Sequence, residues 1–138
     1  MKFDRKASAV WQGGGETGEG KLTTGSGELN NTAYEFKTRF KDAKGTNPEE
    51  LIGAAYAGCY TMQLAFFLEE EGYTATKLHT DATVYFADGS IPKIDLTLEG
   101  EVPNISADEF KKIAEKAKKE CPVGKLLNAE KNLTVTLV

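Results

Sequence analysis

The sequence is poor in the residues that build the commonest metal and cofactor sites. Among its 138 residues there are only two cysteines and one histidine. Cys59 and Cys121 stand far apart in the chain, so there is no CxxC redox motif, and with His79 they do not form a zinc site at these spacings. Neither a GxSxG motif nor a dinucleotide-binding glycine fingerprint occurs. We therefore expect no bound metal and no cofactor.

Basic segments are also lacking. The net charge is −4, and no block of lysine and arginine has aromatic residues interleaved, so nucleic-acid binding is not expected. Residues 13–20 are rich in glycine, but neither a Lys-Ser/Thr pair nor a predicted helix follows them. They indicate a hairpin turn and not a phosphate-binding loop. The first six residues are charged and lack the apolar stretch of a signal peptide, which favours a cytoplasmic protein.

Charge is absent from one long stretch, residues 51–68, which is almost long enough to cross a bilayer. The stretch contains glycine, tyrosine, threonine and glutamine, and its flanks at residues 49–50 and 69–71 are acidic. Because positively charged flanks are missing, we predict no membrane span. The stretch instead favours a helix that is buried on most of its sides.

The rest of the chain alternates between strand and helix patterns, and its length fits one domain over residues 1–138. Strands are predicted at residues 6–12, 21–26, 33–40, 77–86, 93–102 and 133–137, and helices at 47–71, 106–119 and 122–128. An Asp88-Gly89 turn joins the fourth strand to the fifth. The order β-β-β-α-β-β-α-α-β predicts an α+β fold.

The first long helix has a strong start signal. Asn47 is an N-cap residue, Pro48 suits the first turn, and Gly72 ends the helix. A helix of about 24 residues spans ~36 Å, and we expect it to bend or break near Gly53 or Gly58. Its many small residues favour close packing against another helix, such as that of a symmetric copy.

Cys59 lies within this predicted helix. A buried cysteine often acts only as a small hydrophobic side chain, and that interpretation stays open. A reactive cysteine needs a nearby cation or a helix N-terminus that favours the thiolate. Because Cys59 stands about three turns into the helix, its cation must come from elsewhere.

Arg39 is the best candidate for that cation, although it could equally be an exposed strand residue. Its guanidinium is permanently charged, would favour a thiolate at pH 7, and could bind both oxygens of a peroxide. Glu49 could orient Arg39 through a bidentate pair, or could simply be a carboxylate at a helix N-terminus. Along an unbroken helix Glu49 and Cys59 are about 15 Å apart, so one arginine cannot readily touch both. We therefore predict a site that combines groups from two chains.

Cys121 is suited to be a second thiol. With Pro122 at the first helical position, the Cys121 sulfur is expected near free backbone N–H groups, which lower the pKa of a thiol. Alternatively, Cys121 is a packed residue at a helix start. In a dithiol mechanism Cys59 attacks the O–O bond of a peroxide and becomes a sulfenic acid, and Cys121 condenses with it to a disulfide.

A family resemblance rests on three stretches of the sequence. They are residues 38–40 (TRF), 45–59 (GTNPEELIGAAYAGC) and 121–123 (CPV). These stretches resemble the OsmC/Ohr family, the osmotically induced and organic-hydroperoxide-resistance proteins, and the first two look more like the OsmC branch. The predicted elements are similar to those of the family over essentially the whole chain.

The resemblance implies a thiol peroxidase that uses neither haem nor metal and prefers organic hydroperoxides to hydrogen peroxide. Cys59 matches the peroxide-attacking cysteine, Cys121 the resolving cysteine, and Arg39 and Glu49 the activating arginine and its carboxylate partner. The resemblance also implies an intertwined homodimer with a long buried central helix and active sites at the interface, reduced by a dithiol such as a lipoylated protein. One departure is Gly124, where many relatives place serine, and this bears on the positioning of Cys121.

Three residues close to Cys59 in the sequence, Tyr56, Tyr60 and Met62, are predicted to bind the alkyl tail of the substrate. Two alternatives keep the same two cysteines: a non-catalytic dimeric binding protein with packed thiols, and a redox sensor that signals to a partner through the disulfide. Titration of the thiols against a hydroperoxide distinguishes the enzyme from the binding protein. Only the enzyme loses two thiols per chain rapidly and reversibly.

Overall fold

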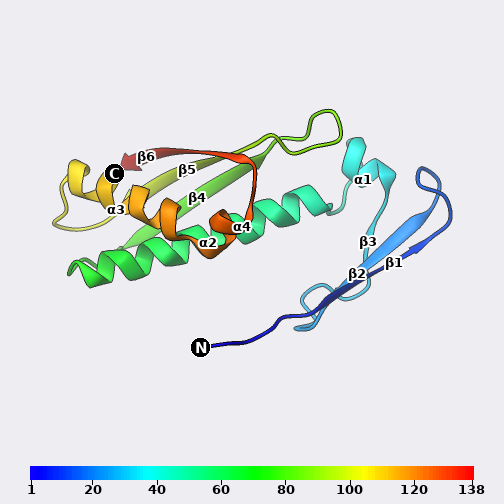
Figure 1. The fold of residues 1–138 in the computed structure, drawn as a ribbon, viewed down its shortest axis with the longest axis horizontal. Helices are drawn as coiled ribbons and strands as arrows, with labels where there is room; N and C mark the ends of the chain where they lie inside the picture. Colours follow the sequence, from blue (N-terminus) through cyan, green and yellow to red (C-terminus); the bar gives the residue numbers. More distant parts are fainter. The chain divides into compact units, whose positions relative to one another are not determined.

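A computed structural model describes the whole chain, residues 1–138 (Figure 1). The chain divides into two compact units, Met1–Leu51 and Ile52–Val138. Each unit contains its own three-stranded sheet. The single domain over residues 1–138 stays a prediction.

The first unit is an antiparallel sheet followed by a short helix. Its elements are β1 (Ala7–Gln12), β2 (Glu19–Thr24), β3 (Thr32–Tyr34) and α1 (Phe36–Phe40). The strands pair in the order β1-β2-β3. The glycine-rich segment returns β1 onto β2, with Gln12 opposite Glu19, so the predicted hairpin is confirmed.

The predicted strand at residues 33–40 is wrong over its second half, which forms α1. The hydroxyl of Thr38 donates to the carbonyl of Glu35 at 3.0 Å and accepts from its N–H at 3.0 Å, which closes a helical turn. The rings of Phe36 and Phe40 lie 5.0 Å apart, as expected for neighbours on one face of a helix. So short an alternation of apolar and polar residues does not distinguish a strand from one helical turn.

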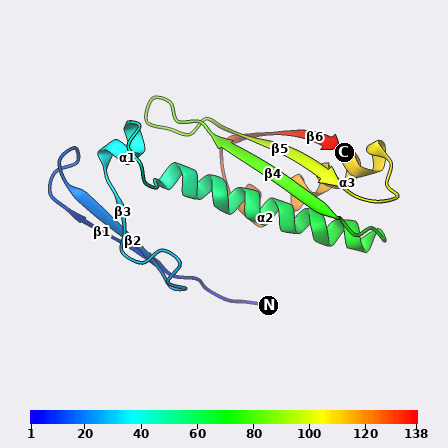
Figure 2. The ribbon, with the colours of Figure 1, turned by 180° about the vertical axis from the view of Figure 1, so that it is seen from behind.

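The second unit packs helices on one face of a mixed sheet (Figures 1 and 2). Its elements are the helix α2 (Pro48–Glu70) from Ile52 onward, β4 (Lys77–Val84), β5 (Lys93–Glu101), α3 (Ala107–Glu120), α4 (Pro122–Leu126) and β6 (Glu130–Leu137). Strand β5 pairs antiparallel with β4 and parallel with β6. A parallel pair needs a crossover connection, which α3 and α4 provide. The predicted α+β class is confirmed.

The sheet of the second unit has one buried and one exposed face. Along β5, Ile94, Leu96 and Leu98 are buried, while the side chains between them face the polar side. The turn between β4 and β5 lies at Asp88 and Gly89, whose φ angles of 51° and 77° are typical of a type I′ hairpin turn. The predicted hairpin is therefore confirmed.

Helix α2 is continuous from Pro48 to Glu70. It therefore does not break at Gly53 or Gly58, and the alternative, a bend at these glycines, stays a prediction. Asn47 caps its start, because Oδ1 accepts from the N–H of Glu50 at 2.8 Å. Gly72, with a φ of 88°, ends the helix as predicted, since only glycine adopts this backbone conformation without strain.

One face of α2 forms the core of the second unit. Tyr56, Tyr60, Leu64 and Leu68 are fully buried against the sheet and against the apolar face of α3. By length and composition alone α2 is apolar enough to cross a membrane. This packing, however, is that of a core helix in a globular unit.

The opposite face of α2 is exposed in the single chain. Gly58 lies on it, and the side chains of Met62 and Phe66 are 64% and 56% exposed. The helix is therefore not buried on most of its sides within one chain, contrary to the prediction. The difference arises because a single chain supplies a packing partner for only one face.

Candidate active site

Two thiols meet where α2 passes the start of α4. Cys59 lies in α2, and Cys121 is the residue between α3 and α4. Their Sγ atoms are 3.2 Å apart, with the Cys121 thiol donating toward Cys59. Both cysteines are free; Cys121 is fully buried, whereas Cys59 is partly exposed. At this separation only a small movement is needed to form a disulfide.

The sequence around Cys121 explains its position. Pro122 disfavours a helical conformation at the residue before it, so α3 ends and Cys121 becomes the extended N-cap of α4. Its Sγ accepts a hydrogen bond from the N–H of Gly124 at 3.5 Å. Burial raises the pKa of the Cys121 thiol more than this N–H lowers it. The expected lowered pKa is therefore wrong, and Cys121 is a protonated thiol at neutral pH.

In the first unit, Arg39 and Glu49 form an ion pair. Nε and Nη2 of Arg39 donate to Oε1 of Glu49 at 2.8 and 2.7 Å. Both donors share one oxygen, so the pair differs from the expected two-oxygen fork, and the buried Oε2 has no hydrogen-bond partner. The side chain of Arg39 is 38% exposed and that of Glu49 only 12%, so the cation is reachable while its anchor is enclosed.

The ion pair is held by the junction of α1 with α2. Arg39 lies in α1, and Glu49 lies in the first turn of α2. Asn47 joins these elements, because its Nδ2 donates to the carbonyl of Thr38 at 3.0 Å while its Oδ1 caps α2. The Asn47 signal that predicted a helix start therefore also positions the charge pair.

An aromatic cavity of about 240 Å³ adjoins Arg39 in the first unit. Its walls are formed by Trp11, Gly15, Tyr34, Glu35, Phe36, Arg39 and Phe40. The rings of Trp11 and Tyr34 are 5.5 Å apart, and the guanidinium carbon of Arg39 lies 4.9 Å from the ring centre of Phe40. No pattern in the sequence predicted this cavity. The only local signal for it was the Phe36 and Phe40 pair on either side of Arg39.

The predicted substrate-binding residues lie on different sides of α2. Tyr60 is fully buried and its hydroxyl donates to the carbonyl of Ala114 at 3.0 Å. Tyr56 is also fully buried, whereas Met62 is exposed. In the single chain the three side chains do not share one surface, and their contact with substrate stays a prediction.

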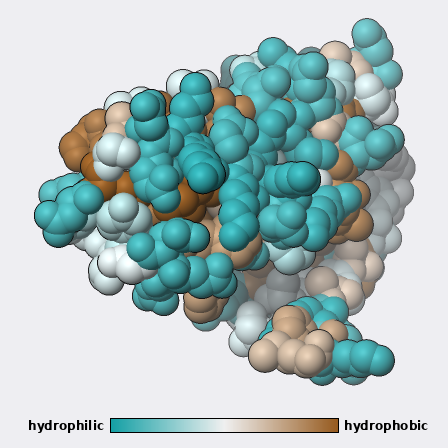
Figure 3. Space-filling model, turned by 60° about the vertical axis from the view of Figure 1, so that its left-hand side comes forward, coloured by the Kyte–Doolittle hydropathy of each residue, from teal (hydrophilic) through white to brown (hydrophobic).

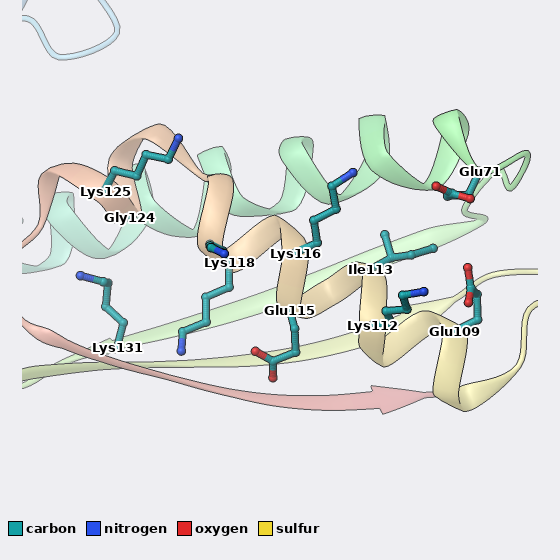
Figure 4. A pocket seen from close by; sticks show the side chains of 11 residues that line it. Glu71, Glu109, Lys112, Ile113, Glu115, Lys116, Lys118, Gly124, Lys125 and Lys131 are labelled. Atoms are coloured by element: carbon teal, nitrogen blue, oxygen red, sulfur yellow. The ribbon is translucent and has the colours of Figure 1, made fainter.

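A groove of about 820 Å³ lies on the outer side of α3 and α4 (Figure 4). It is lined by Glu71, Glu109, Lys112, Ile113, Glu115, Lys116, Lys118, Lys119, Gly124, Lys125 and Lys131. Hydrophilic side chains predominate on the face seen in Figure 3, and the lysines of the groove project around it in Figure 4. The groove is larger than the aromatic cavity, yet neither cysteine lines it. Its size therefore does not mark the place of the thiol chemistry.

The four residues predicted to be catalytic form two pairs, one in each unit. The thiol pair can cycle between a dithiol and a disulfide, because the sulfur atoms are already in contact. The charge pair holds a permanent cation that can stabilise an anion. His79 takes no part in either pair; its ring interacts with Asp81 on the exposed face of β4.

A family model and similar proteins of known name point to the same family. The family described as OsmC-like protein matches residues 41–136. The chain is 45% identical over 141 residues to Peroxiredoxin OsmC of Escherichia coli (strain K12), covering 99% of each chain. It is 31% identical over 101 residues to Organic hydroperoxide resistance protein-like 1 of Staphylococcus saprophyticus subsp. saprophyticus, covering 69% of this chain and 72% of that one.

A solved structure supports the same fold. The crystal structure of an OsmC like protein from Mycoplasma pneumoniae matches with a TM-score of 0.78 at 21% identity, over 100% of this chain and 99% of that chain. The resemblance noted in the three sequence stretches is thus confirmed over nearly the full length. Since both the family match and the 45% identical relative cover most of its residues, the chain belongs to the OsmC-like protein family.

Proposed function

We propose that this protein is a cysteine-based peroxidase that reduces organic hydroperoxides with two thiols, Cys59 and Cys121. The observation that carries the proposal is the 3.2 Å approach of their sulfur atoms, which come from elements far apart in the chain. The relatives support the reaction class, since one is named a peroxiredoxin and another an organic hydroperoxide resistance protein. A merely packed pair of cysteines would not require the sulfur atoms to meet.

Cys59 is the attacking residue, because its side chain is partly exposed while Cys121 is buried. Its thiolate attacks the terminal oxygen of the hydroperoxide and forms an S–O bond as the O–O bond breaks, so that Cys59 becomes a sulfenic acid. The leaving alkoxide takes a proton from solvent and departs as the alcohol. Cys121 then attacks that sulfur, so that a disulfide forms and water leaves. An external dithiol, for which a lipoylated protein is one candidate, reduces the disulfide by exchange at the more accessible sulfur, Cys59.

Arg39 supplies the positive charge that favours the Cys59 thiolate, and Glu49 holds the guanidinium in place. Because α2 is continuous, its rise separates residues 49 and 59 by about 15 Å. A guanidinium bound to Glu49 is therefore not expected to reach Cys59 of the same chain. The proposed site combines Arg39 of one chain with Cys59 of a second chain.

This arrangement requires a homodimer. The exposed face of α2 carries Ala54, Gly58, Met62 and Phe66 at intervals of four residues, which is one continuous strip of a helix. A second copy of the same helix is the partner that this strip fits, because small residues allow two backbones to approach closely. Covering the strip in this way also accounts for an apolar helix in a soluble, cytoplasmic protein.

The aromatic cavity beside Arg39 accounts for a preference for organic hydroperoxides. Trp11, Tyr34, Phe36 and Phe40 provide an apolar wall next to a cation. An alkyl or aryl group gains free energy by leaving water for such a wall, whereas hydrogen peroxide has no such group. The substrate tail would lie in this cavity with its O–O group at the guanidinium.

Titration of thiols tests the proposal. The reduced protein is treated with tert-butyl hydroperoxide, and free thiols are counted before and after addition of dithiothreitol. We expect two thiols per chain to be lost rapidly and then recovered, with a slower reaction for hydrogen peroxide. Cys121→Ser is expected to complete one turnover and then stop. Slow or absent loss of thiols would instead support the packed-cysteine binding protein, and a disulfide that no dithiol donor turns over would support the sensor.

A further inference from the structure

The hydroxyl of Tyr56 is buried and has no protein hydrogen-bond partner. The residue is fully buried within one chain, so neither bulk solvent nor a second subunit can supply the missing partner. Tyr60, one turn later, is equally buried, but its hydroxyl donates to the carbonyl of Ala114. Because an unpaired buried polar group lowers stability, nearly all such groups are hydrogen-bonded, and the exception at Tyr56 needs an explanation.

The Tyr56 side chain lies in the same cluster of buried and partly buried residues as both cysteines. It precedes Cys59 by three residues and is therefore its neighbour on one face of α2. Its ring also packs on Gly124, where an added methyl group would lie 3.2 Å from Cε1 and 3.4 Å from Oη of Tyr56. The N–H of Gly124 in turn donates to Sγ of Cys121.

The missing partner is an atom that the resting dithiol state does not contain. Oxidation by a peroxide adds one oxygen to the sulfur of Cys59. Resting on the proposed two-thiol function, we propose that the Tyr56 hydroxyl donates a hydrogen bond to the sulfenic oxygen of Cys59 and carries the proton that the resolving step requires. Tyr56 is thus a catalytic residue for disulfide formation.

The protonation states suit this role. Burial, together with the nearby Cys121 and Cys59, raises the pKa of Tyr56 to about 12, so the phenol is a proton donor at neutral pH. Burial also raises the pKa of Cys121, so this thiol must lose its proton as it attacks. A phenol near both cysteines can give one proton and take the other.

The resolving step then balances. The sulfur of Cys121 forms an S–S bond with the sulfur of Cys59 as the S–O bond of the sulfenic acid breaks. Cys121 is oxidised, and Cys59 is reduced from the sulfenic to the disulfide level. The phenol proton passes to the departing oxygen, which leaves as water, and the thiol proton of Cys121 passes to the phenol oxygen and restores Tyr56.

Gly124 leaves the space that the tyrosine ring occupies. A side chain there would press on the ring at contacts tighter than ordinary packing, and would move the hydroxyl away from the sulfur atoms. The lack of a side chain at position 124 is therefore coupled to the position of Tyr56. We expect Gly124→Ala to slow disulfide formation although Tyr56 itself is unchanged.

The test follows a single turnover in Tyr56→Phe, which removes the hydroxyl and keeps the ring. The reduced protein receives one equivalent of tert-butyl hydroperoxide; dimedone traps the sulfenic acid at set times, and mass spectrometry counts the disulfide. We expect disulfide formation from the sulfenic acid to slow by roughly 10²-fold. Its rate should also rise more steeply with pH, since Cys121 must then lose its proton to solvent base. The matched control is Tyr73→Phe, at a tyrosine that follows the end of α2. This variant should form the disulfide from the sulfenic acid at the wild-type rate.

Thermal unfolding separates catalysis from packing. Because Tyr56→Phe removes an unpaired buried hydroxyl, its melting temperature should equal or exceed that of the wild type. A large drop in melting temperature with slow resolution would assign a packing role and overturn the proposal. Equal resolution rates and equal pH dependence would also overturn it while leaving the two-thiol peroxidase intact. Absence of both sulfenic acid and disulfide in the wild type after addition of the peroxide would remove the proposed function itself.

Discussion

The two units of this chain differ in what they bury. Every fully buried large side chain lies between residues 56 and 121, in the second unit. In the first unit the buried side chains are those of Thr38 and Glu49, both polar, and all of β1 (Ala7–Gln12) is exposed. The second unit thus has a hydrophobic core, whereas the first is a small sheet that buries no apolar face within one chain.

The chemical groups divide in the same way. In the first unit, the partly exposed guanidinium of Arg39 is bound to the largely buried carboxylate of Glu49. In the second unit, Cys121 is buried and Cys59 is partly exposed. A cation keeps its charge at little cost near the surface, while a resolving thiol is protected by burial from direct oxidation. Under the proposed function, the first unit would recognise the substrate and the second would hold the two thiols that are oxidised to a disulfide.

The largest expected effect is the loss of the nucleophile in the second unit. Cys59→Ser should reduce tert-butyl hydroperoxide no faster than buffer does, because a serine hydroxyl does not ionise at pH 7. A coupled assay with dithiothreitol measures the turnover, and an unchanged melting temperature serves as the control for folding. Full multiple-turnover activity in this variant would remove the role assigned to the second unit.

A smaller loss is expected from removal of the cation in the first unit. Arg39→Gln should slow the oxidation of Cys59 at pH 7 by roughly 10- to 100-fold, because the thiolate is then less populated. Mixing Arg39→Gln chains with Cys59→Ser chains should restore activity, since each mixed dimer would contain one intact site. Failure of the mixture to recover activity would place both groups of the site in one chain.

The difference in burial predicts unequal losses of stability. Leu64→Ala in the core of the second unit should lower the free energy of unfolding by about 2–5 kcal/mol, because it leaves a cavity. Val10→Ala, at a β1 residue that is 58% exposed, should change it by no more than about 0.5 kcal/mol. Urea denaturation of dilute protein measures both. An equally large loss at Val10 would show that β1 is buried in solution.

The smallest effect concerns stability at alkaline pH. The pKa of Tyr56 is raised from 10.0 to about 12 in the folded chain, so above pH 10 only the unfolded chain loses this proton readily. The resulting contribution is complete below pH 10 and is lost as the pH rises toward 12, by at most about 1.4 kcal/mol per pH unit. The difference in unfolding free energy between wild type and Tyr56→Phe, measured at pH 9 and pH 11, isolates it. A difference independent of pH would contradict the raised pKa.

Much of the fold could be predicted because its signals are local. Asn47 marked the start of α2 and Gly72 its end, and Ser106 marked the start of α3 through a side chain that accepts from the N–H of Glu109. Asp88 and Gly89 marked the hairpin. Each of these residues acts on its own backbone, so its effect can be predicted without knowledge of the rest of the molecule.

The remaining features depend on packing. The pKa of Cys121 is raised because the thiol is buried among residues distant in sequence. The backbone N–H of Gly124, which lowers this pKa, therefore led to a prediction in the wrong direction. The unpaired hydroxyl of Tyr56 is likewise a property of its surroundings. The parallel pairing of β6 with β5 could not be predicted either, because parallel and antiparallel strands show the same alternation of apolar and polar residues in the sequence.

Cys121 lies in the crossover that carries the chain from β5 to β6, and it is 62 residues from Cys59 in sequence. A covalent link between them would brace this connection against α2 and would restrict the unfolded chain far more than the folded one. The oxidised protein should therefore have a higher melting temperature and be digested more slowly by protease than the reduced protein. Oxidation by a peroxide would thus stabilise the fold, and reduction of the disulfide would remove this stabilisation until the next oxidation.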